Sequence, residues 1–315
     1  MTAALDSPAV ETRALAKRYG DRAAVAGLDL HVSRGEMFGL VGADGSGKST
    51  AIRLIAGIAR PSGGSGRVLG FDLLTQTDEI KARIGYLSQS FTLYGDLTVD
   101  ENVRFFADLH GVPDFAERRD ELLEFTRLAP ARRRLAQTLS GGMRKKLALA
   151  CTLIHTPDLI LLDEPSTGVD PVSRGEFWNV LALAVERGVT VVMTTPYLDE
   201  AERCHRIAFM HRGRVVRTST PAEARAAVAG RVFDIECPDP RAAYALLRGE
   251  WPEEDLVLYA ERVHVWTARG EDAVARSVRM LDERGLGPAV LTRGHASLED
   301  AFVDLLKSDI AAGDS

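Results

Sequence analysis

The sequence predicts an α/β protein that carries a smaller α+β domain, and three observations support this fold class. A glycine-rich stretch at 42–50 stands between an apolar run and a run with helical periodicity, which indicates strand, loop and helix. Four apolar residues within 158–164 lead into two carboxylates, a pattern typical of a buried strand. Beyond 230 the pattern becomes strand, helix, strand, strand, helix and strand, the order of a ferredoxin-like unit.

Composition limits the class of protein. The chain has 315 residues, which fits one large domain and an accessory one, and it is 45% hydrophobic and 27% charged, as globular proteins are. No run approaches the roughly 20 apolar residues that a membrane span needs, and residues 1–11 lack the features of a secretory signal. We therefore expect a cytoplasmic protein. A formal net charge of −6 gives no reason to expect nucleic acid as a partner.

The three cysteines, Cys151, Cys204 and Cys237, stand far apart and show no metal-ligand spacing. This favours buried, reduced thiols over disulfides or metal ligands.

The N-terminal segment 10–31 alternates apolar and polar residues around 18–22, which predicts two antiparallel strands joined by a turn. Tyr19 lies shortly before the glycine-rich stretch. Its ring either stacks on a nucleotide base or is a half-buried strand residue, and the pattern alone leaves both interpretations open.

The stretch 42–50 has the spacing of a phosphate-binding loop. Its glycines let backbone N–H groups point inward at an anion, and the helix behind it adds its positive N-terminal end. Lys48 can reach the β- and γ-phosphates, and the Ser49 hydroxyl can hold Mg²⁺. We expect the following residues to bind a nucleoside triphosphate: Gly42, Asp44, Gly45, Ser46, Gly47, Lys48, Ser49 and Thr50.

The next elements are shorter. Residues 61–66 read as a turn and 67–70 as a short strand. The run 84–89 is apolar and ends at Gln89. An amide at a strand end can ligate a metal or orient water, and the alternative is an ordinary exposed loop residue.

A helical insertion is predicted from 97 to 135. Thr98 and Glu101 have the spacing of a capping box, and apolar residues follow at helical intervals. The basic clusters 132–134 and 144–146 lack interleaved aromatics, so they read as solvated faces rather than a nucleic-acid patch.

Two further motifs follow. Ser140 is a good N-cap for the helical run 144–153, and Gly141 and Gly142 allow close backbone approach, so the start of this helix either holds an anion or is simply capped. The strand-end Asp163 is placed to complete a Mg²⁺ shell with Ser49, and Glu164 to activate water.

In this order, these motifs resemble the nucleotide-binding subunit of ATP-binding cassette (ABC) transporters. The likeness covers about 8–225, and within the family the chain looks most like the ATPases of ABC-2 type multidrug exporters. The segments that carry the resemblance are the phosphate loop, Gln89, Leu-Ser-Gly-Gly-Met at 139–143, Leu-Leu-Asp-Glu-Pro at 161–165, Gly-Val-Asp-Pro at 168–171, 195–202 and 298–302.

The resemblance implies a P-loop core of ABC type with an antiparallel β subdomain, and it implies several residue roles. Tyr19 matches the adenine-stacking aromatic, and Gln89 matches a residue that links Mg²⁺ to the membrane-domain contact. Asp170 matches a dimer-interface aspartate. Ser140 and Gly142, with Gly141 between them, match residues that touch the nucleotide held by the other subunit, so a dimer is implied.

Two positions depart from the family pattern. Met143 replaces the commoner glutamine, which is a mild change. Pro196 stands where the family usually has a histidine, and proline has no side-chain donor for the γ-phosphate or the catalytic glutamate. We therefore expect a weakened ATP site and an asymmetric heterodimer with a second cassette, the alternative being a slow homodimer.

The chain is thus predicted to be an ATPase that binds ATP and Mg²⁺ and has low activity alone. It is expected to lie on the inner face of the membrane, beside a separate transmembrane ABC-2 permease. Its predicted domains are 8–225, with a helical subdomain at about 97–155, and an accessory domain at 230–308, whose last helix from Leu298 to Leu306 docks back, helps dimerise or caps the chain. The alternative function is a soluble ABC ATPase that acts on ribosomes or nucleic acid.

Overall fold

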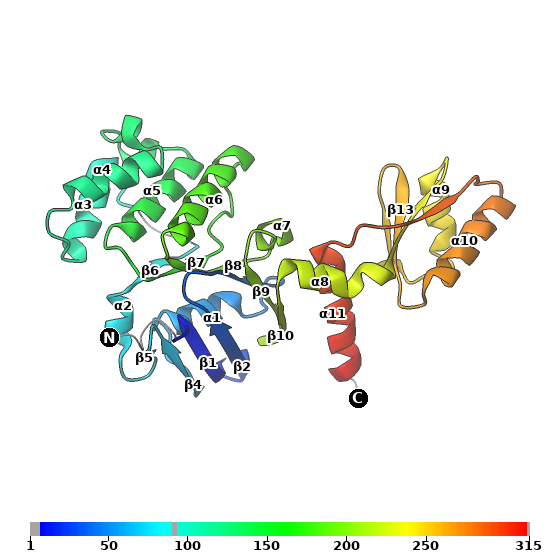
Figure 1. Cartoon of the computed structure of the whole chain (residues 1–315), viewed down its shortest axis with the longest axis horizontal. Coiled ribbons are helices and arrows are strands. Elements are labelled where there is room, and N and C mark those ends of the chain that lie inside the picture. Colours follow the sequence, from blue (N-terminus) through cyan, green and yellow to red (C-terminus); the bar gives the residue numbers. More distant parts are fainter. Residues whose placement is uncertain (1–6, 90–92, 314–315) are drawn as a thin grey trace. The chain divides into compact units, whose positions relative to one another are not determined.

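The computed structural model describes residues 7–89 and 93–313. Contacts within the chain divide it into two units, Met1–Thr218 and Ser219–Ser315, each of which has its own sheets and helices (Figure 1). Within the described ranges, no helix combines the length and the apolar character that crossing a membrane would require.

The first unit begins with an antiparallel sheet in the order β2-β1-β4-β5. The predicted hairpin is confirmed, since Val10 pairs with Val32 and Tyr19 with Arg22. The predicted turn at 61–66 is wrong from Gly63 onward, because Gly63–Val68 form β4 and pair with β1. A Cβ on Gly64 would lie 2.2 Å from the carbonyl oxygen of Ala14, so the glycine serves close strand approach. The strands are β1 Val10–Tyr19, β2 Arg22–Val32, β4 Gly63–Val68 and β5 Phe71–Asp72.

The second sheet of this unit is largely parallel and has the order β10-β9-β3-β8-β7-β6. Helix α1 lies between the two sheets, and α5 and α6 cover the other face of the parallel sheet (Figure 1). Strand β7 is buried at every position, as its run of apolar residues predicts. The bounds are β3 Met37–Val41, β6 Ile84–Leu87, β7 Leu159–Asp163, β8 Thr190–Thr195, β9 Arg206–His211, β10 Arg214–Ser219, α1 Lys48–Ile55, α5 Gly141–Leu153 and α6 Pro171–Glu186.

A helical segment interrupts the parallel sheet between β6 and β7. The predicted capping box at Thr98 and Glu101 is present. The prediction of a solvated cluster at 144–146 is wrong for Lys146, which is buried and donates to Glu176 Oε2 at 2.7 Å. The short and helical elements of this unit are α2 Thr77–Lys81, α3 Val99–Leu109, α4 Ala116–Phe125, the 3₁₀ turns Ala129–Ala131 and Ala136–Thr138, and α7 Leu198–Ala201.

The second unit contains a four-stranded sheet in the order β12-β13-β11-β14. Its strands pair antiparallel, and with two crossover helices they give the predicted ferredoxin-like arrangement. Apolar residues of α9 and α10 form one core with the sheet. The bounds are α8 Pro221–Val228, 3₁₀ Ala229–Arg231, β11 Val232–Glu236, α9 Pro240–Leu247, 3₁₀ Glu253–Asp255, β12 Leu256–Leu258, β13 Arg262–Trp266, α10 Glu271–Glu283, β14 Val290–Arg293 and α11 Leu298–Gly313.

Three polar groups attach α11 within this unit. Both ring nitrogens of the buried His264 face carboxylates, Nδ1 at 2.7 Å from Asp234 and Nε2 at 3.1 Å from Asp300. Arg231 pairs with Asp304, and Lys307 pairs with Asp255. Helix α11 also packs against α8 of the same unit.

Candidate nucleotide site

The glycine-rich stretch forms a loop between β3 and α1, at the carboxyl end of a parallel strand, where open α/β sheets bind ligands. Gly47 precedes α1 with φ of +105°, and no side chain caps the helix start. A Cβ on Gly42 would lie 2.3 Å from the carbonyl oxygen of Met210, and one on Gly47 2.4 Å from that of Ala24. The loop therefore requires glycine at both positions and leaves backbone N–H groups available to an anion.

Lys48 lies buried beneath this loop. Its Nζ donates to the carbonyl oxygens of Gly42 at 2.7 Å and Ala43 at 3.1 Å. Burial lowers the pKa of Lys48, against the attraction of Glu164 and other acids. Ser46 adds a buried hydroxyl oxygen that has no hydrogen-bond partner among the described residues. Both side chains suit an anion at this point.

Asp163 ends β7 and is fully buried. Its Oδ1 accepts from Ser49 Oγ and from Thr194 Oγ1, both at 2.8 Å. Its Oδ2 is buried and has no hydrogen-bond partner in the described part of the chain, with the Arg53 guanidinium 4.0 Å away. A carboxylate oxygen left open beside a serine hydroxyl fits Mg²⁺, which prefers oxygen ligands.

Glu164 follows with a φ of +48°, an unusual conformation for a residue with a side chain. Its backbone N–H donates to Thr194, to the carbonyl oxygen at 3.2 Å and to Oγ1 at 3.0 Å, which fixes this turn. Gln89 Nε2 donates to Glu164 Oε2 at 3.0 Å, and Lys48 Nζ lies 3.9 Å from Oε1. Burial raises the pKa of Glu164, against the attraction of Lys48, so this carboxylate is a stronger base than an exposed one.

A cavity of about 310 Å³ opens between the loop and the antiparallel sheet. Tyr19 lines it and is 53% exposed, with the Lys17 Nζ 5.1 Å from the centre of its ring. The other lining residues are Arg22, Ala24, Gly45, Gly47, Lys48, Ser49, Thr50 and Glu164. Asp44 is exposed in the same loop and contributes charge near Lys48 rather than a cavity wall.

The predicted motif at 139–143 lies elsewhere. Ser140 caps α5 by accepting from the Met143 N–H at 3.2 Å, and a Cβ on Gly142 would lie 2.2 Å from the Ser173 side chain. Asp170 caps α6 by accepting from the Ser173 N–H at 2.9 Å, so the two helix starts touch. Gly141 lines a different cavity, of about 350 Å³, together with Gln89 and Gly168. Residues 140–142 therefore do not line the Lys48 cavity of their own chain.

The structure also brings in residues that the sequence interpretation missed. Thr194 joins the backbone of Glu164 to Asp163, as described above. Glu200 is buried and accepts from Thr195 Oγ1 at 2.6 Å and from Ser166 Oγ, which ties together the ends of β7 and β8. Lys145 Nζ donates to the backbone oxygen of Gln89 at 3.1 Å. Pro196 directly follows β8 and offers no donor.

The fold and these contacts define a nucleotide-binding protein of the phosphate-loop class. Residues 25–167 match the ABC transporter family. The daunorubicin/doxorubicin resistance ATP-binding protein DrrA of Streptomyces peucetius is 38% identical to this chain. The match covers 94% of this chain and 92% of DrrA. The chain belongs to the ATP-binding proteins of ABC transporters, and its first unit is an ABC ATPase domain.

Two further comparisons agree. The probable multidrug ABC transporter ATP-binding protein YbhF of Escherichia coli (strain K12) is 40% identical to this chain over 249 residues. The match covers 78% of this chain but only 42% of YbhF. A solved dimeric structure of a post-hydrolysis state of the ATP-binding cassette MJ0796, bound to ADP and Pi, matches with a TM-score of 0.61 and 28% identity. That match covers 67% of this chain and 98% of the cassette.

Proposed function

We propose that this chain binds Mg-ATP and hydrolyses it to drive export through a separate transmembrane subunit. The observation that carries the proposal is the cluster in which Ser49 bonds Asp163, Gln89 bonds Glu164 and Lys48 lies under the phosphate loop. These side chains supply the groups that phosphoryl transfer to water needs: phosphate binding, metal ligation and a general base.

Each residue has a proposed role in this reaction. Lys48 and the loop amides from Gly42 to Ser49, with Thr50 beside them, hold the phosphates, and Tyr19 stacks on the base. Ser49, Gln89 and Asp163 hold Mg²⁺, which when bound neutralises phosphate charge and orients the γ-phosphate. The phosphates of a bound nucleotide would supply further oxygen ligands, since Mg²⁺ is usually held by one or two protein carboxylates together with substrate phosphates.

Glu164 is the proposed base. Its backbone is fixed by Thr194, its side chain is oriented by Gln89, and its raised pKa suits proton abstraction from water. Release of the Gln89 contact would free the carboxylate, which gives Gln89 a positioning role between the nucleotide and a membrane partner.

The proposed partner is an ABC-2 type permease, with this chain working peripherally on the inner face of the membrane. The drug-resistance protein DrrA, similar along nearly its whole length, supports the exporter class. The proposed nucleotide-binding domain is 8–225, and the accessory domain is 230–308.

We further propose that two cassettes form a head-to-tail dimer. Residues 140–142 and Asp170 lie together, away from the Lys48 cavity of their own chain, and so are available to a nucleotide held by another subunit. Because Pro196 offers no donor, the site built on this chain's Lys48 turns ATP over slowly, and a second, different cassette supplies the phosphate loop of the faster site. The alternative is a homodimer with two slow sites.

The test is ATP turnover by the purified full chain. We expect tight Mg-ATP binding and slow hydrolysis that Glu164→Gln abolishes. Pro196→His should raise the rate, because a hydrogen bond to transition-state charge is worth on the order of 3 kcal/mol, about a hundredfold. Fast hydrolysis by the wild-type chain, lost in Glu164→Gln, would remove the reason for a second cassette. Turnover that survives Glu164→Gln would refute the assigned base.

A further inference from the structure

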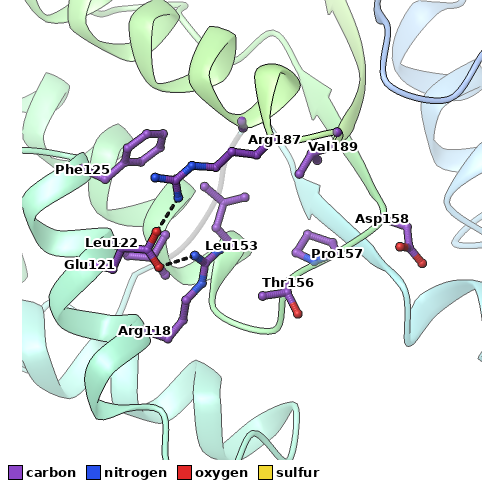
Figure 2. A pocket seen from close by; sticks show the side chains of 12 residues that line it. Arg118, Glu121, Leu122, Phe125, Leu153, Thr156, Pro157, Asp158, Arg187 and Val189 are labelled. Atoms are coloured by element: carbon purple, nitrogen blue, oxygen red, sulfur yellow. Dashed lines mark hydrogen bonds and ion pairs between the residues drawn. The ribbon is translucent and has the colours of Figure 1, made fainter.

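A cavity of about 320 Å³ lies within the first unit, between the helical segment and the starts of two parallel strands. Figure 2 shows its three walls: α4, the connection from α5 to β7, and the turn from α6 to β8. Its lining includes neither the phosphate loop nor any proposed catalytic residue. Its volume stands at the small end of ligand pockets, so it suits a small molecule.

The floor of this cavity is apolar. Leu122 and Phe125 come from α4, Leu153 from the end of α5, and Pro157 and Val189 from the two connections (Figure 2). Such a floor accommodates a short aliphatic or aromatic group.

The rim is cationic. Glu121 accepts from Arg118 at 2.7 Å and also from Arg187, so two guanidinium groups share one carboxylate. The guanidinium of Arg187 also lies 5.3 Å from the centre of the Phe125 ring. The carboxylate of Asp158 points away from both arginines (Figure 2). The lining as a whole has two arginines and two acidic residues, but at this edge two guanidinium groups share one carboxylate, so the local charge is positive.

Arg118 has unused donor capacity here. Its Nε is buried and has no hydrogen-bond partner among the residues that the structure describes. An unpaired buried donor is unfavourable, but this Nε is shielded from solvent. The groups that a bound molecule can reach are the terminal N–H groups of Arg118 and Arg187, whose side chains are 27% and 55% exposed. A carboxylate is the acceptor that best matches two adjacent guanidinium groups.

The position of the cavity connects it to the nucleotide site. Strands β7 and β8 pair in parallel register and both begin at the cavity, where the Thr190 N–H donates to the backbone oxygen of Asp158 at 3.1 Å. At their other ends, Thr194 donates to Asp163 at 2.8 Å. The remaining wall, α4, belongs to the helical segment that also carries Ser140.

We propose that this cavity is a regulatory site for a small amphipathic acid. The carboxylate of the ligand would pair with Arg118 and Arg187 in competition with Glu121, and its apolar part would fill the floor. The bound acid would join α4 to the starts of β7 and β8 and so change the rate of ATP turnover. This regulatory effect rests on the proposed ATPase function, whereas binding does not.

Calorimetry on the full chain without nucleotide tests binding, with octanoate as the probe and octan-1-ol as its uncharged match. We expect one saturable octanoate site and at least about tenfold weaker binding of octan-1-ol, because charge-assisted hydrogen bonds are the stronger ones. Arg118→Leu should weaken octanoate binding about tenfold and leave octan-1-ol unchanged. Val189→Phe should fill the floor and abolish binding of both.

Three results would overturn parts of this proposal. No saturable octanoate binding, or undiminished binding by a folded Val189→Phe variant, would show that this cavity is not a binding site for the acid. Equal affinity for octanoate and octan-1-ol, or no effect of Arg118→Leu on octanoate binding, would show that the site does not recognise a carboxylate. Unchanged ATP turnover at saturating octanoate would remove the regulation. A chain without any turnover would refute the proposed function, and the calorimetry would still decide the site.

Discussion

Two helices of the first unit begin with glycines, and they begin in different ways. Helix α1 follows Gly47 without any side-chain cap, so its first N–H groups are unsatisfied by the protein's own side chains. Helix α5 follows Ser140, whose hydroxyl accepts from the Met143 N–H. The first start is left open to an anion, whereas the second is already capped by a side chain of its own chain. In α5, Gly142 serves instead to let the Ser173 side chain approach the helix start.

This comparison predicts the largest effect for the uncapped start. Lys48→Ala should lower the affinity for ATP on the order of a hundredfold or more, because a buried cation with charge-assisted contacts is lost. Calorimetry measures the affinity, and Lys81→Ala, a lysine of α2 outside the loop, is the matched control. Unchanged affinity in Lys48→Ala would refute the phosphate-loop assignment.

At the capped start of α5, a substitution should leave ATP affinity unchanged and lower turnover instead. In Gly142→Ala the new Cβ would overlap the Ser173 side chain, at 2.2 Å, and push the start of α5 away from that of α6. ATP affinity of the isolated chain should stay the same, while turnover by the assembled transporter should fall on the order of a hundredfold, as misplacement by an ångström does. Gly175→Ala in α6, where nothing lies within 4 Å, is the control. Loss of ATP affinity in Gly142→Ala would place residues 140–142 in their own chain's site.

The start of α11, in the second unit, differs from both, because a charged carboxylate takes part in its cap. Ser297 and Asp300 cap each other, and Asp300 also bonds His264. Burial disfavours the charged ring, but the hydrogen bonds to Asp300 and Asp234 outweigh it and raise the pKa of His264 above its ordinary value of 6.5. Arg262, 3.4 Å from Asp234, and the Tyr259 ring complete the surroundings.

Because the folded pKa of His264 is raised, its stabilisation is fully present below pH 6.5 and is lost as pH rises through the folded value. The pKa of Asp300 is lowered below 3.8, since hydrogen bonds from His264 and Ser297 outweigh its burial, so its contribution is lost only in acid.

Amide hydrogen exchange in α11 of the full chain, corrected for intrinsic rates, measures this dependence. Protection should fall as the pH rises above 6.5 and through the raised pKa of His264, by up to about tenfold per pH unit. His264→Gln should remove the dependence. Protection that does not change with pH in the wild type would mean that the ring is not charged.

The smallest effect is expected at the cap of α5. Ser140→Ala removes one hydrogen bond to the Met143 N–H and should lower the free energy of unfolding of the first unit by about 1 kcal/mol. Urea unfolding measures the change, with Thr98→Ala in α3, which also removes an N-cap, for comparison. A loss several times larger would show that Ser140 does more than cap a helix.

The sequence was sufficient for the parts of the site that are local in the chain. The phosphate loop, the Asp163–Glu164 strand end and the capping box each depend on neighbouring residues, so spacing identifies them. The order of elements was also enough for the ferredoxin-like unit, because that order fixes the sheet topology.

Residues that act across strands could not be identified in this way. Thr194 and Glu200 reach β7 from β8 and α7, and nothing in their own neighbourhood marks them as partners of Asp163 or Ser166. Likewise, the glycines of β4 have the composition of a turn, and only their pairing with β1 makes them a strand. Lys146 looked exposed because its partner Glu176 lies on another helix.

The separation of Lys48 from residues 140–142 has a consequence for genetics. If the chain pairs with itself, a copy carrying Lys48→Ala and a copy carrying Gly142→Ala place both lesions in one composite site and leave the other composite site intact. Co-expression of two inactive alleles would then restore the transporter's activity in part. If the chain pairs only with a different cassette, every dimer carries one of the lesions and no allele pair can complement. Intragenic complementation therefore distinguishes a homodimer from a heterodimer without purification of either.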